Sequence, residues 1–483
     1  MNSDHTLHLK QPKVFPFSVG TALFERSGFY ALAFVLVMFV KETYKISDHE
    51  AFVLFGVFNA LVFLTPAVGG YLADNIFGIR RTMLLGLCIE TVGLMCLALP
   101  TEKLLYFSLS CIILGIGFFK VGPTDLMGRS YHKNDPRIDN GFTFYYMAMN
   151  IGASISPIAI GYLQRYYGWH IAFIFATAVM LAGIATYFIL RHRASEFDVE
   201  VSKHKVSRKN AYLLTVGTVA ACGVCVFLLK YTIVANISFI VATACLLFYF
   251  LNEIRKSPKK EQLEIIACLI LIFIGMVFFV MYFQLFMSLE LYIKRVVSHN
   301  LFGFDIPASA FLSLNNIWVV ILSPILVFIY NLLTKHNKSV AITSKFSFGL
   351  LTIGLCFITL YVSTFFHDSS WQVSSIWVVI AIMLFSLGEL LVSALGVAMV
   401  TRIAPKRLFG VMMGAWFLIA SSLASAISSS IASLASVPDN IPNMQDALTI
   451  YGKAFLEMGM IGIVGAIIVF LVGPSIKRMA DIK

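Results

Sequence analysis

Long apolar stretches alternate with short polar or basic segments along almost the whole chain. A run of about twenty apolar residues is long enough for one helix to cross the hydrocarbon core of a bilayer. The pattern therefore predicts an all-α, polytopic membrane protein with fourteen transmembrane helices. The fourteen predicted ranges are 14–40, 51–74, 82–99, 103–127, 142–163, 169–190, 211–230, 232–251, 264–292, 312–333, 343–366, 375–399, 409–436 and 453–473.

The predicted spans form three groups. We assign residues 1–190 to an N-terminal six-helix bundle, residues 191–262 to an inserted two-helix hairpin with basic linkers, and residues 263–483 to a C-terminal six-helix bundle. Two bundles of this kind work by rocking about a site near the middle of the bilayer. The halves share no strong sequence repeat, so fourteen helices without an internal repeat remain the alternative.

Lysine and arginine are distributed unevenly between the predicted loops. They gather at Arg80 and Arg81, between Arg191 and Lys209, and between Arg255 and Lys260, whereas the loops on the opposite side hold few. Because basic loops stay on the cytoplasmic side, we expect both termini to be cytoplasmic. Residues 1–13 lack the features of a cleaved signal peptide, so we expect the first span to be retained.

The composition supports the membrane class and limits the possible chemistry. The chain is 59% hydrophobic and 13% charged, which no soluble domain of this length tolerates. The net charge of +11 does not indicate nucleic acid, because the basic residues lie in short loops on one side. All eight cysteines lie inside apolar segments, so we expect neither disulfides, nor a metal site, nor an organic cofactor.

Two charged residues stand in the middle of the first predicted span. Inserting Glu25 and Arg26 there costs roughly 2.5–3.5 kcal/mol each. Ala22, Arg26 and Tyr30 are spaced four apart and share one helical face. The pair is either a structural ion pair that joins two helices or part of a substrate or proton site.

A basic turn follows the second predicted span. Residues 69–81 read GGYLADNIFGIRR, in which Gly70 and Gly78 permit close backbone approach, Asp74 ends a helix, and Arg80 and Arg81 anchor the cytoplasmic face. This stretch resembles the short-loop signature of the major facilitator superfamily.

Further stretches narrow the resemblance. They are GFFKV at 117–121, DPRIDNGFTFYYMAMNIG at 135–152, GFDIPASAFLSLN at 303–315, GEL at 388–390, MVTRIAP at 399–405 and GVMMGAWFL at 410–418. Together with Glu25 and Arg26 they resemble the proton-dependent oligopeptide transporter family, in order and over nearly the whole chain. The resemblance implies two six-helix bundles with an inserted hairpin, and a secondary transporter that imports di- or tripeptides with protons through alternating access.

The resemblance also implies roles for individual residues. A peptide is a zwitterion, and Arg26 and Lys120 would hold its carboxylate while Glu389 would hold its amino group. The remaining matched residues would hydrogen-bond the peptide or wall a side-chain pocket: Tyr30, Asn150 and Asn315 for the first role and Trp416 for the second. The alternatives are ordinary packing for Tyr30 and Trp416, interhelical hydrogen bonds for the asparagines, and a salt bridge between Lys120 and Glu25.

The proton path is less complete. No histidine lies in the middle of a span, so we expect the coupling proton on a buried carboxylate, Glu25 or Glu389. Glu90 and Glu290 have no role in the resemblance, and Glu290 lies near a span end where water could solvate it. The chain departs from the family where acidic residues are usual, at Ala22 and Phe283, and also at Phe63 and Asn316. These losses weaken the expectation of tight proton coupling.

Two other functions stay open. One is a facilitator for another small zwitterion or peptide-like solute with weak proton linkage, and the other is a membrane sensor that binds peptide without moving it. An enzyme is not expected, since no catalytic triad, zinc ligand set or phosphate-binding glycine loop is present. We expect a monomer in the lipid bilayer of the plasma membrane, or of the inner membrane in a cell with two.

Overall fold

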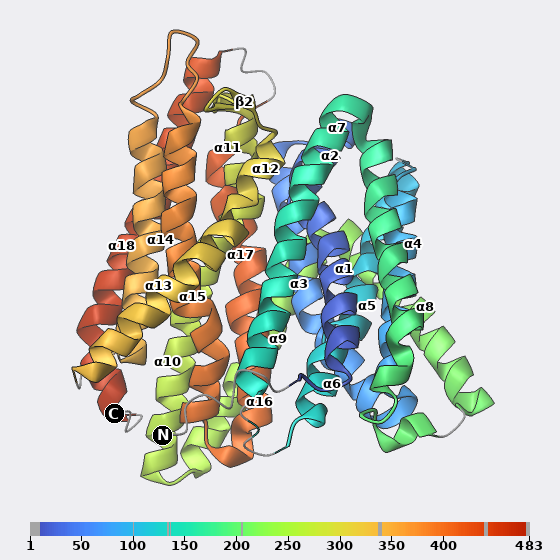
Figure 1. Ribbon diagram of the computed structural model, residues 1–483. Coiled ribbons are helices and arrows are strands. Elements are labelled where there is room, and N and C mark those ends of the chain that lie inside the picture. The colour runs from blue at the N-terminus through green and yellow to red at the C-terminus, as the bar shows by residue number, and fades with distance from the viewer. Residues whose placement is uncertain are drawn as a thin grey trace. The chain divides into compact units, whose positions relative to one another are not determined.

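The computed structural model describes residues 10–99, 101–132, 135, 137–203, 206–336, 341–438 and 443–479 (Figure 1). These residues are almost entirely helical. The α-helices are α1 (Phe15–Ala33), α2 (Leu36–Tyr44), α3 (Asp48–Leu72), α4 (Ile79–Leu97), α5 (Glu102–Phe119), α6 (Gly122–Ser130), α7 (Ile138–Leu190), α8 (Arg208–Lys230), α9 (Thr232–Lys256), α10 (Lys259–Tyr282), α11 (Ser288–Val296), α12 (Ala308–Leu312), α13 (Leu314–Lys335), α14 (Ile342–Ser363), α15 (Ser375–Ile403), α16 (Phe409–Ala415), α17 (Ala424–Ala432) and α18 (Met444–Met479).

Short turns of tighter or wider helix connect several of these elements. They are η1 (Ala73–Phe77), η2 (Arg191–Ala194), η3 (Glu200–Lys203), η4 (Phe283–Phe286), η5 (Lys406–Leu408), η6 (Trp416–Leu423) and η7 (Ser433–Ala435). The strands β1 (Asn300–Leu301) and β2 (Phe304–Asp305) pair antiparallel in a small hairpin.

Every range predicted as a span is mostly helical, although several of them consist of two or more helical elements in succession. Among the described residues, eleven helices are long and apolar enough to cross a membrane, or twelve if α1 and α2, which are bent by 46°, form one span. Helix α7 covers two predicted ranges, and its ribbon reverses direction between them (Figure 1). Gly168, with φ 83° and ψ 175°, is the non-helical residue inside α7. Helix α4 carries three charges in 19 residues, which sets it apart from the more apolar helices. The structure thus agrees with the fourteen predicted spans.

The chain divides into two compact units. The first comprises Met1–Phe34 and Leu61–Tyr231, and in it α1 packs along α7 while α4 packs against α5 and α7. The second comprises Val35–Ala60 and Thr232–Lys483, and in it α14 packs between α18 and α15. The helix α2 and the first half of α3 therefore belong with the second unit. The division into 1–190, 191–262 and 263–483 stays a prediction.

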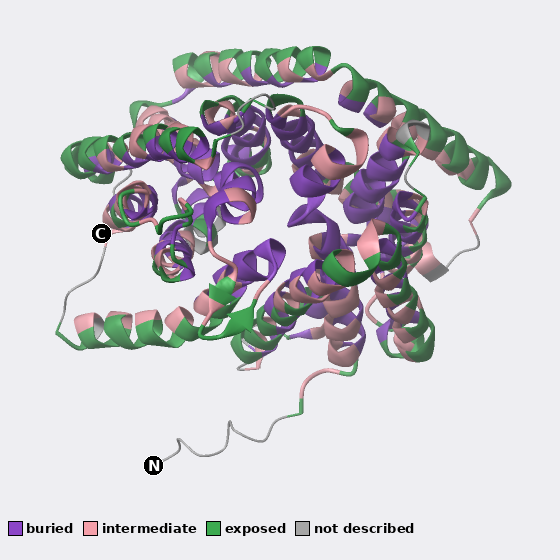
Figure 2. Cartoon of the chain, turned by 90° about the horizontal axis from the view of Figure 1, so that it is seen from above, coloured by how far each residue is buried: buried purple, intermediate pink, exposed green. Residues whose placement is uncertain are grey.

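Burial follows the helix faces. In Figure 2 many helices carry buried residues along one side and exposed residues along the other. The two hairpin helices are the most open, since only 11% of the most apolar window of α8 and 22% of that of α9 is buried. Their exposed residues include Val219 and Ile233. Because a lipid-facing side chain loses nothing by exposure to hydrocarbon, such a surface suits a bilayer.

Candidate functional site

Glu25 and Arg26 form a buried ion pair on α1. The Arg26 guanidinium donates from Nε to Glu25 Oε2 at 2.6 Å and from Nη2 to Glu25 Oε1 at 2.5 Å. Glu25 is 1% exposed and Arg26 is 9% exposed. Two parallel hydrogen bonds of this kind fix the guanidinium plane and partly offset the cost of burying both charges.

Lys120 lies beside this pair at the end of α5. Pro123 has no backbone N–H and interrupts the helix between α5 and α6, so that Lys120 stands next to a break in the predicted span. Its ammonium lies 4.7 Å from the centre of the Phe63 ring, and it interacts electrostatically with Glu25 and Arg26. The salt bridge between Lys120 and Glu25 that the sequence left open is not formed among the described residues, because both Glu25 oxygens face Arg26.

Two further predicted contacts, Tyr30 and Asn150, belong to the same unit. Tyr30 stacks on Phe34 with ring centres 5.4 Å apart and is partly exposed. The Asn150 amide donates to the carbonyl of Tyr146, one turn earlier on α7, at 2.8 Å. The first unit therefore gathers the two predicted cations, while the substrate contacts of Tyr30 and Asn150 stay predictions.

Glu389 is the centre of the second unit's predicted site. It lies on α15, where its Oε2 accepts a hydrogen bond from Asn315 Nδ2 at 2.9 Å and its Oε1 accepts one from the Tyr282 hydroxyl at 3.3 Å. Asn315 also donates to Ser386 Oγ at 3.1 Å. The predicted pair of Glu389 and Asn315 is thus in direct contact. Sequence reasoning did not identify Tyr282 or Ser386, because their contacts cross from one helix to another.

Trp416 fills a gap between helices of the same unit. A Cβ added at Gly396 would lie 1.9 Å from the indole Cζ2, so only glycine fits opposite the ring. The ring of Phe279 meets the indole edge to face at 6.0 Å, and Trp416 is 3% exposed. The side chain is packed among helices in this conformation, and its predicted place in a substrate pocket stays a prediction.

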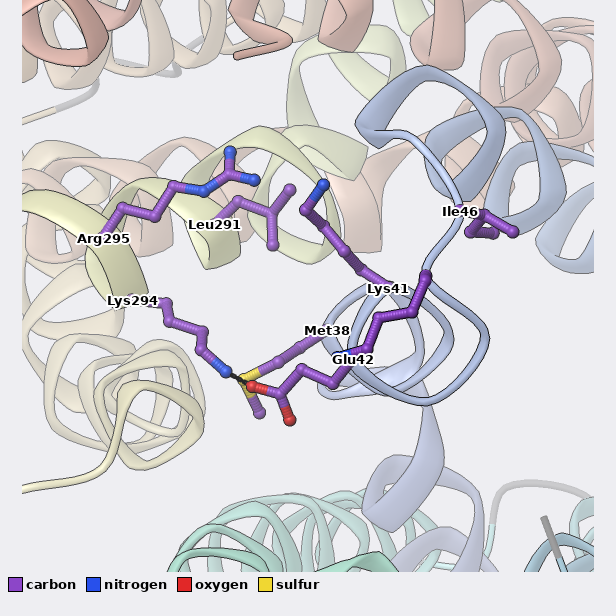
Figure 3. Close-up of a pocket in the computed structure, with 8 residues that line it drawn as sticks. Met38, Lys41, Glu42, Ile46, Leu291, Lys294 and Arg295 are labelled. Carbon is purple, nitrogen blue, oxygen red and sulfur yellow. Dashed lines mark ion pairs between the residues drawn. The ribbon is translucent and has the colours of Figure 1, made fainter. Parts of the chain in front are cut away.

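A second charged cluster in this unit was missed by sequence reasoning. Asp48, at the start of α3, accepts two hydrogen bonds from Arg295 at 2.6 and 2.8 Å, and it pairs with Lys41 at 2.7 Å. Lys294 pairs with Glu42 nearby (Figure 3). Four of these side chains border a cavity of about 380 Å³ between α2 and α11: Lys41, Glu42, Lys294 and Arg295. Charges near span ends look solvated in sequence, but here they join α2 and α3 to α11.

The loop motif at residues 69–81 is held by residues 198–202, which were predicted only as part of a basic linker. The Asp198 carboxylate accepts from Arg80 Nε at 2.9 Å and from the Ile79 backbone at 2.8 Å. Arg81 donates to the carbonyl of Ser202 at 2.9 Å, and Asp74 pairs with Arg129 at 3.2 Å. Gly78, with φ 85°, lies against Ser202, and Gly70 faces Val121. The predicted anchoring arginines therefore bind protein groups.

Two carboxylates without a predicted role are fully buried. Glu90 on α4 is 0% exposed, and neither of its oxygens has a hydrogen-bond partner among the described residues. Glu290 on α11 is also 0% exposed and lies beside the backbone of Met38. The expectation that water could solvate Glu290 is wrong, because α2 packs over it. The positions that lack acidic residues, Ala22 and Phe283, are buried in apolar surroundings.

Comparison with known proteins gives a consistent result. The model of the POT family matches residues 80–450. The dipeptide and tripeptide permease A of Chromobacterium violaceum is 34% identical over 98% of this chain and 95% of its own length. The permease of the same name from Escherichia coli is 32% identical over 98% and 94%.

Solved structures are similar over the same length. The crystal structure of tetrameric PepTSo2 superposes with a TM-score of 0.87 and 29% identity, over 97% of this chain and 99% of that chain. A bacterial homologue of the human drug peptide transporters PepT1 and PepT2 gives a TM-score of 0.86 and 30% identity, over 97% and 100%. These values confirm the fold class predicted from the sequence.

Proposed function

The chain belongs to the POT family, and from this membership we propose that it imports di- and tripeptides by proton symport through alternating access. The family is the one predicted from the sequence motifs. The chain is a transporter and not an enzyme, since relatives that match it over nearly their full length are permeases. The observation that carries the peptide assignment is the presence of buried groups of opposite charge, Arg26 with Lys120 and, separately, Glu389.

These charges suit the two ends of a peptide. Arg26 and Lys120 bind the carboxylate of the peptide, and the partly exposed Glu389 binds its ammonium group. Asn315 and Tyr282 occupy one acceptor site on each Glu389 oxygen and leave the others for the substrate. A site that grips only the ends tolerates many side chains. Tyr30, Asn150 and Trp416 contribute backbone contacts and a side-chain pocket.

Protons are the coupling ion, and no other cofactor takes part. Glu389 is one carrier, since binding an ammonium group and binding a proton satisfy the same carboxylate. Glu25 is the other family position, although Arg26 occupies both of its oxygens in this conformation.

The membrane setting follows from the helices. The chain is a multi-pass membrane protein. We place it in the plasma membrane, or in the inner membrane of a cell with two, with both termini in the cytoplasm. One structurally similar protein was crystallised as a tetramer, but we propose that a single copy transports, because one chain carries both charged groups.

Uptake by purified protein in liposomes tests this function. Labelled dialanine should accumulate when an inward pH gradient is applied and should only equilibrate without one. Equilibration that is unaffected by the gradient would instead support a facilitator. Dialanine binding without uptake would support a sensor, and absence of both would refute a peptide function.

A further inference from the structure

We propose that Glu90 is the residue of the first unit that takes up and releases the transported proton, and that its charge couples the proton to the peptide carboxylate. The inference rests on the proposed function. It assigns a role to a buried carboxylate that neither the sequence motifs nor the family resemblance explains.

Glu90 lies next to the ion pair on α1. It interacts electrostatically with both Glu25 and Arg26. The surroundings of Gly28 on α1 agree with this, because an added Cβ there would lie nearest to Met180 on α7 and would also meet Leu94 on α4, one turn beyond Glu90, at 3.4 Å. Helices α1 and α4 run in the same direction, since one crossing separates them, so Glu90 stands one turn before Gly28, at the level of Glu25.

The surroundings of Glu90 favour exchange of a proton rather than a fixed charge. It is 0% exposed, and neither oxygen has a hydrogen-bond partner among the described residues. The backbone of α5 passes directly over it, because a Cβ at Gly115 would lie 2.6 Å from the Glu90 Cβ. An isolated carboxylate in such a place is costly, so the protonated form is favoured. Glu25 differs, since its two oxygens accept hydrogen bonds from Arg26.

The other groups around α4 do not compensate Glu90 directly. The charged and titratable residues toward the middle and far end of α4 are Glu25, Arg26 and Tyr30 on α1, Cys111 and Lys120 at α5, and Tyr145 and His170 on α7. The groups at its other end, Asp74, Arg129 and Asp198, lie with Arg80, ten residues and about 15 Å along the helix from Glu90.

Charge counting gives the direction of the coupling. The cluster has two cations, Arg26 and Lys120, and two carboxylates, Glu25 and Glu90. With Glu90 protonated the cluster has one net positive charge, which the carboxylate of a peptide neutralises. When Glu90 returns the proton to water, the cluster with its bound peptide becomes negative and the peptide carboxylate is repelled. Proton and peptide therefore bind together and leave together.

The test uses the full-length protein in liposomes and two measurements on each variant. Counterflow of dialanine without a gradient reports peptide exchange, and uptake under an inward gradient reports coupling. A gradient of one pH unit supports about tenfold accumulation in the wild type if one proton moves with each peptide. Glu90→Gln mimics the protonated form, so it should keep counterflow and accumulate several-fold less dialanine than the wild type, although Glu389 is intact. Thr91→Val, on the same helix and also buried, should keep both.

Several results would overturn the proposal. The first is accumulation by Glu90→Gln at the level of the wild type. The second is this same result together with loss of accumulation in Glu290→Gln, which would assign the proton to Glu290. Absence of counterflow in the wild type would refute the peptide function itself, whatever Glu90 does.

A binding measurement on the wild type covers the case in which Glu90→Gln does not fold. Calorimetric affinity for dialanine should weaken as pH rises, whereas affinity for dialanine amide, which has no carboxylate, should change less. An equal pH dependence for the two peptides would refute the coupling.

Discussion

Replacing Glu389 by glutamine should separate the two ends of the peptide. The substitution keeps the size of the side chain and an acceptor oxygen for Asn315, now at 2.9 Å from Glu389 Oε2. The new amide group can donate to the Tyr282 oxygen, which now lies 3.3 Å from Oε1. The local helix packing should therefore persist. What is lost is the negative charge that faces the peptide ammonium.

The size of the effect follows from the kind of contact. A hydrogen bond to a charged group contributes about 1.5–3 kcal/mol, which corresponds to roughly 10- to 150-fold in a dissociation constant. Because glutamine retains one acceptor oxygen, we expect the lower part of this range, about 10- to 30-fold. N-acetyl-dialanine has no ammonium group, so its weaker binding should change by less than about threefold.

Isothermal titration of the purified wild type and Glu389→Gln with both peptides measures these four constants. Asn316→Ala is a suitable control on the neighbouring helix, because Asn316 has no assigned substrate contact. Equal losses for free and acetylated dialanine would refute the role of Glu389, since they would indicate a general disturbance of the site.

Three other predictions concern the scaffold. Asp48→Asn should lower the unfolding free energy by about 2–4 kcal/mol. The loss is smaller than for a fully buried pair, because the side chains of Arg295 and Lys41 are 22% and 18% exposed. Thermal unfolding in detergent measures this change, and an unchanged Tm would contradict it. Gly396→Ala should cost about 1–3 kcal/mol by the same assay, since the new methyl group collides with Trp416; a more stable variant would show that the ring moves freely. Hydrogen bonds from Arg137 lower the pKa of Asp135 to about 2. The stabilisation from this contact is therefore complete above the unfolded pKa of about 3.9 and is lost as pH falls through about 2. Because uptake is measured far above this window, Asp135→Asn should leave the pH profile of uptake unchanged.

The spans were predictable because the bilayer imposes a strong and local requirement. Every crossing needs about twenty apolar residues, and this is visible without knowledge of the neighbours. The range 211–230 became α8 (Arg208–Lys230) on this basis alone. The bend between α1 and α2 was not predicted, since residues 33–36 contain neither proline nor glycine.

The candidate site was only partly predictable. Arg26, Lys120 and Glu389 stand out as charges inside apolar runs, and a motif places Asn315. Tyr282 donates a hydrogen bond to Glu389, which lies 107 residues further along the chain. A contact between residues so far apart cannot be predicted from the local spacing of residues.

Among the charges at the ends of spans, Glu290 was wrongly expected to be solvated, and the contacts of Asp48 and Arg295 were missed. Three charged residues lie near the ends of predicted spans, where side chains usually contact water: Asp48, Arg295 and Glu290. Tertiary packing of α2 and α3 on α11 brings them out of water, and the same kind of packing attaches Asp198 to the loop motif. Burial of this kind depends on which helices meet, and that information lies in the fold.

Binding of peptides with blocked ends tests the central claim most directly. In the proposed function, fixed charges bind the carboxylate and the ammonium group of a short peptide. Titration of the wild type should therefore give measurable binding of dialanine, weaker binding of its acetylated and amidated forms, and none of N-acetyl-dialanine amide. If the doubly blocked peptide bound as tightly as dialanine, charge recognition of the two ends would be refuted.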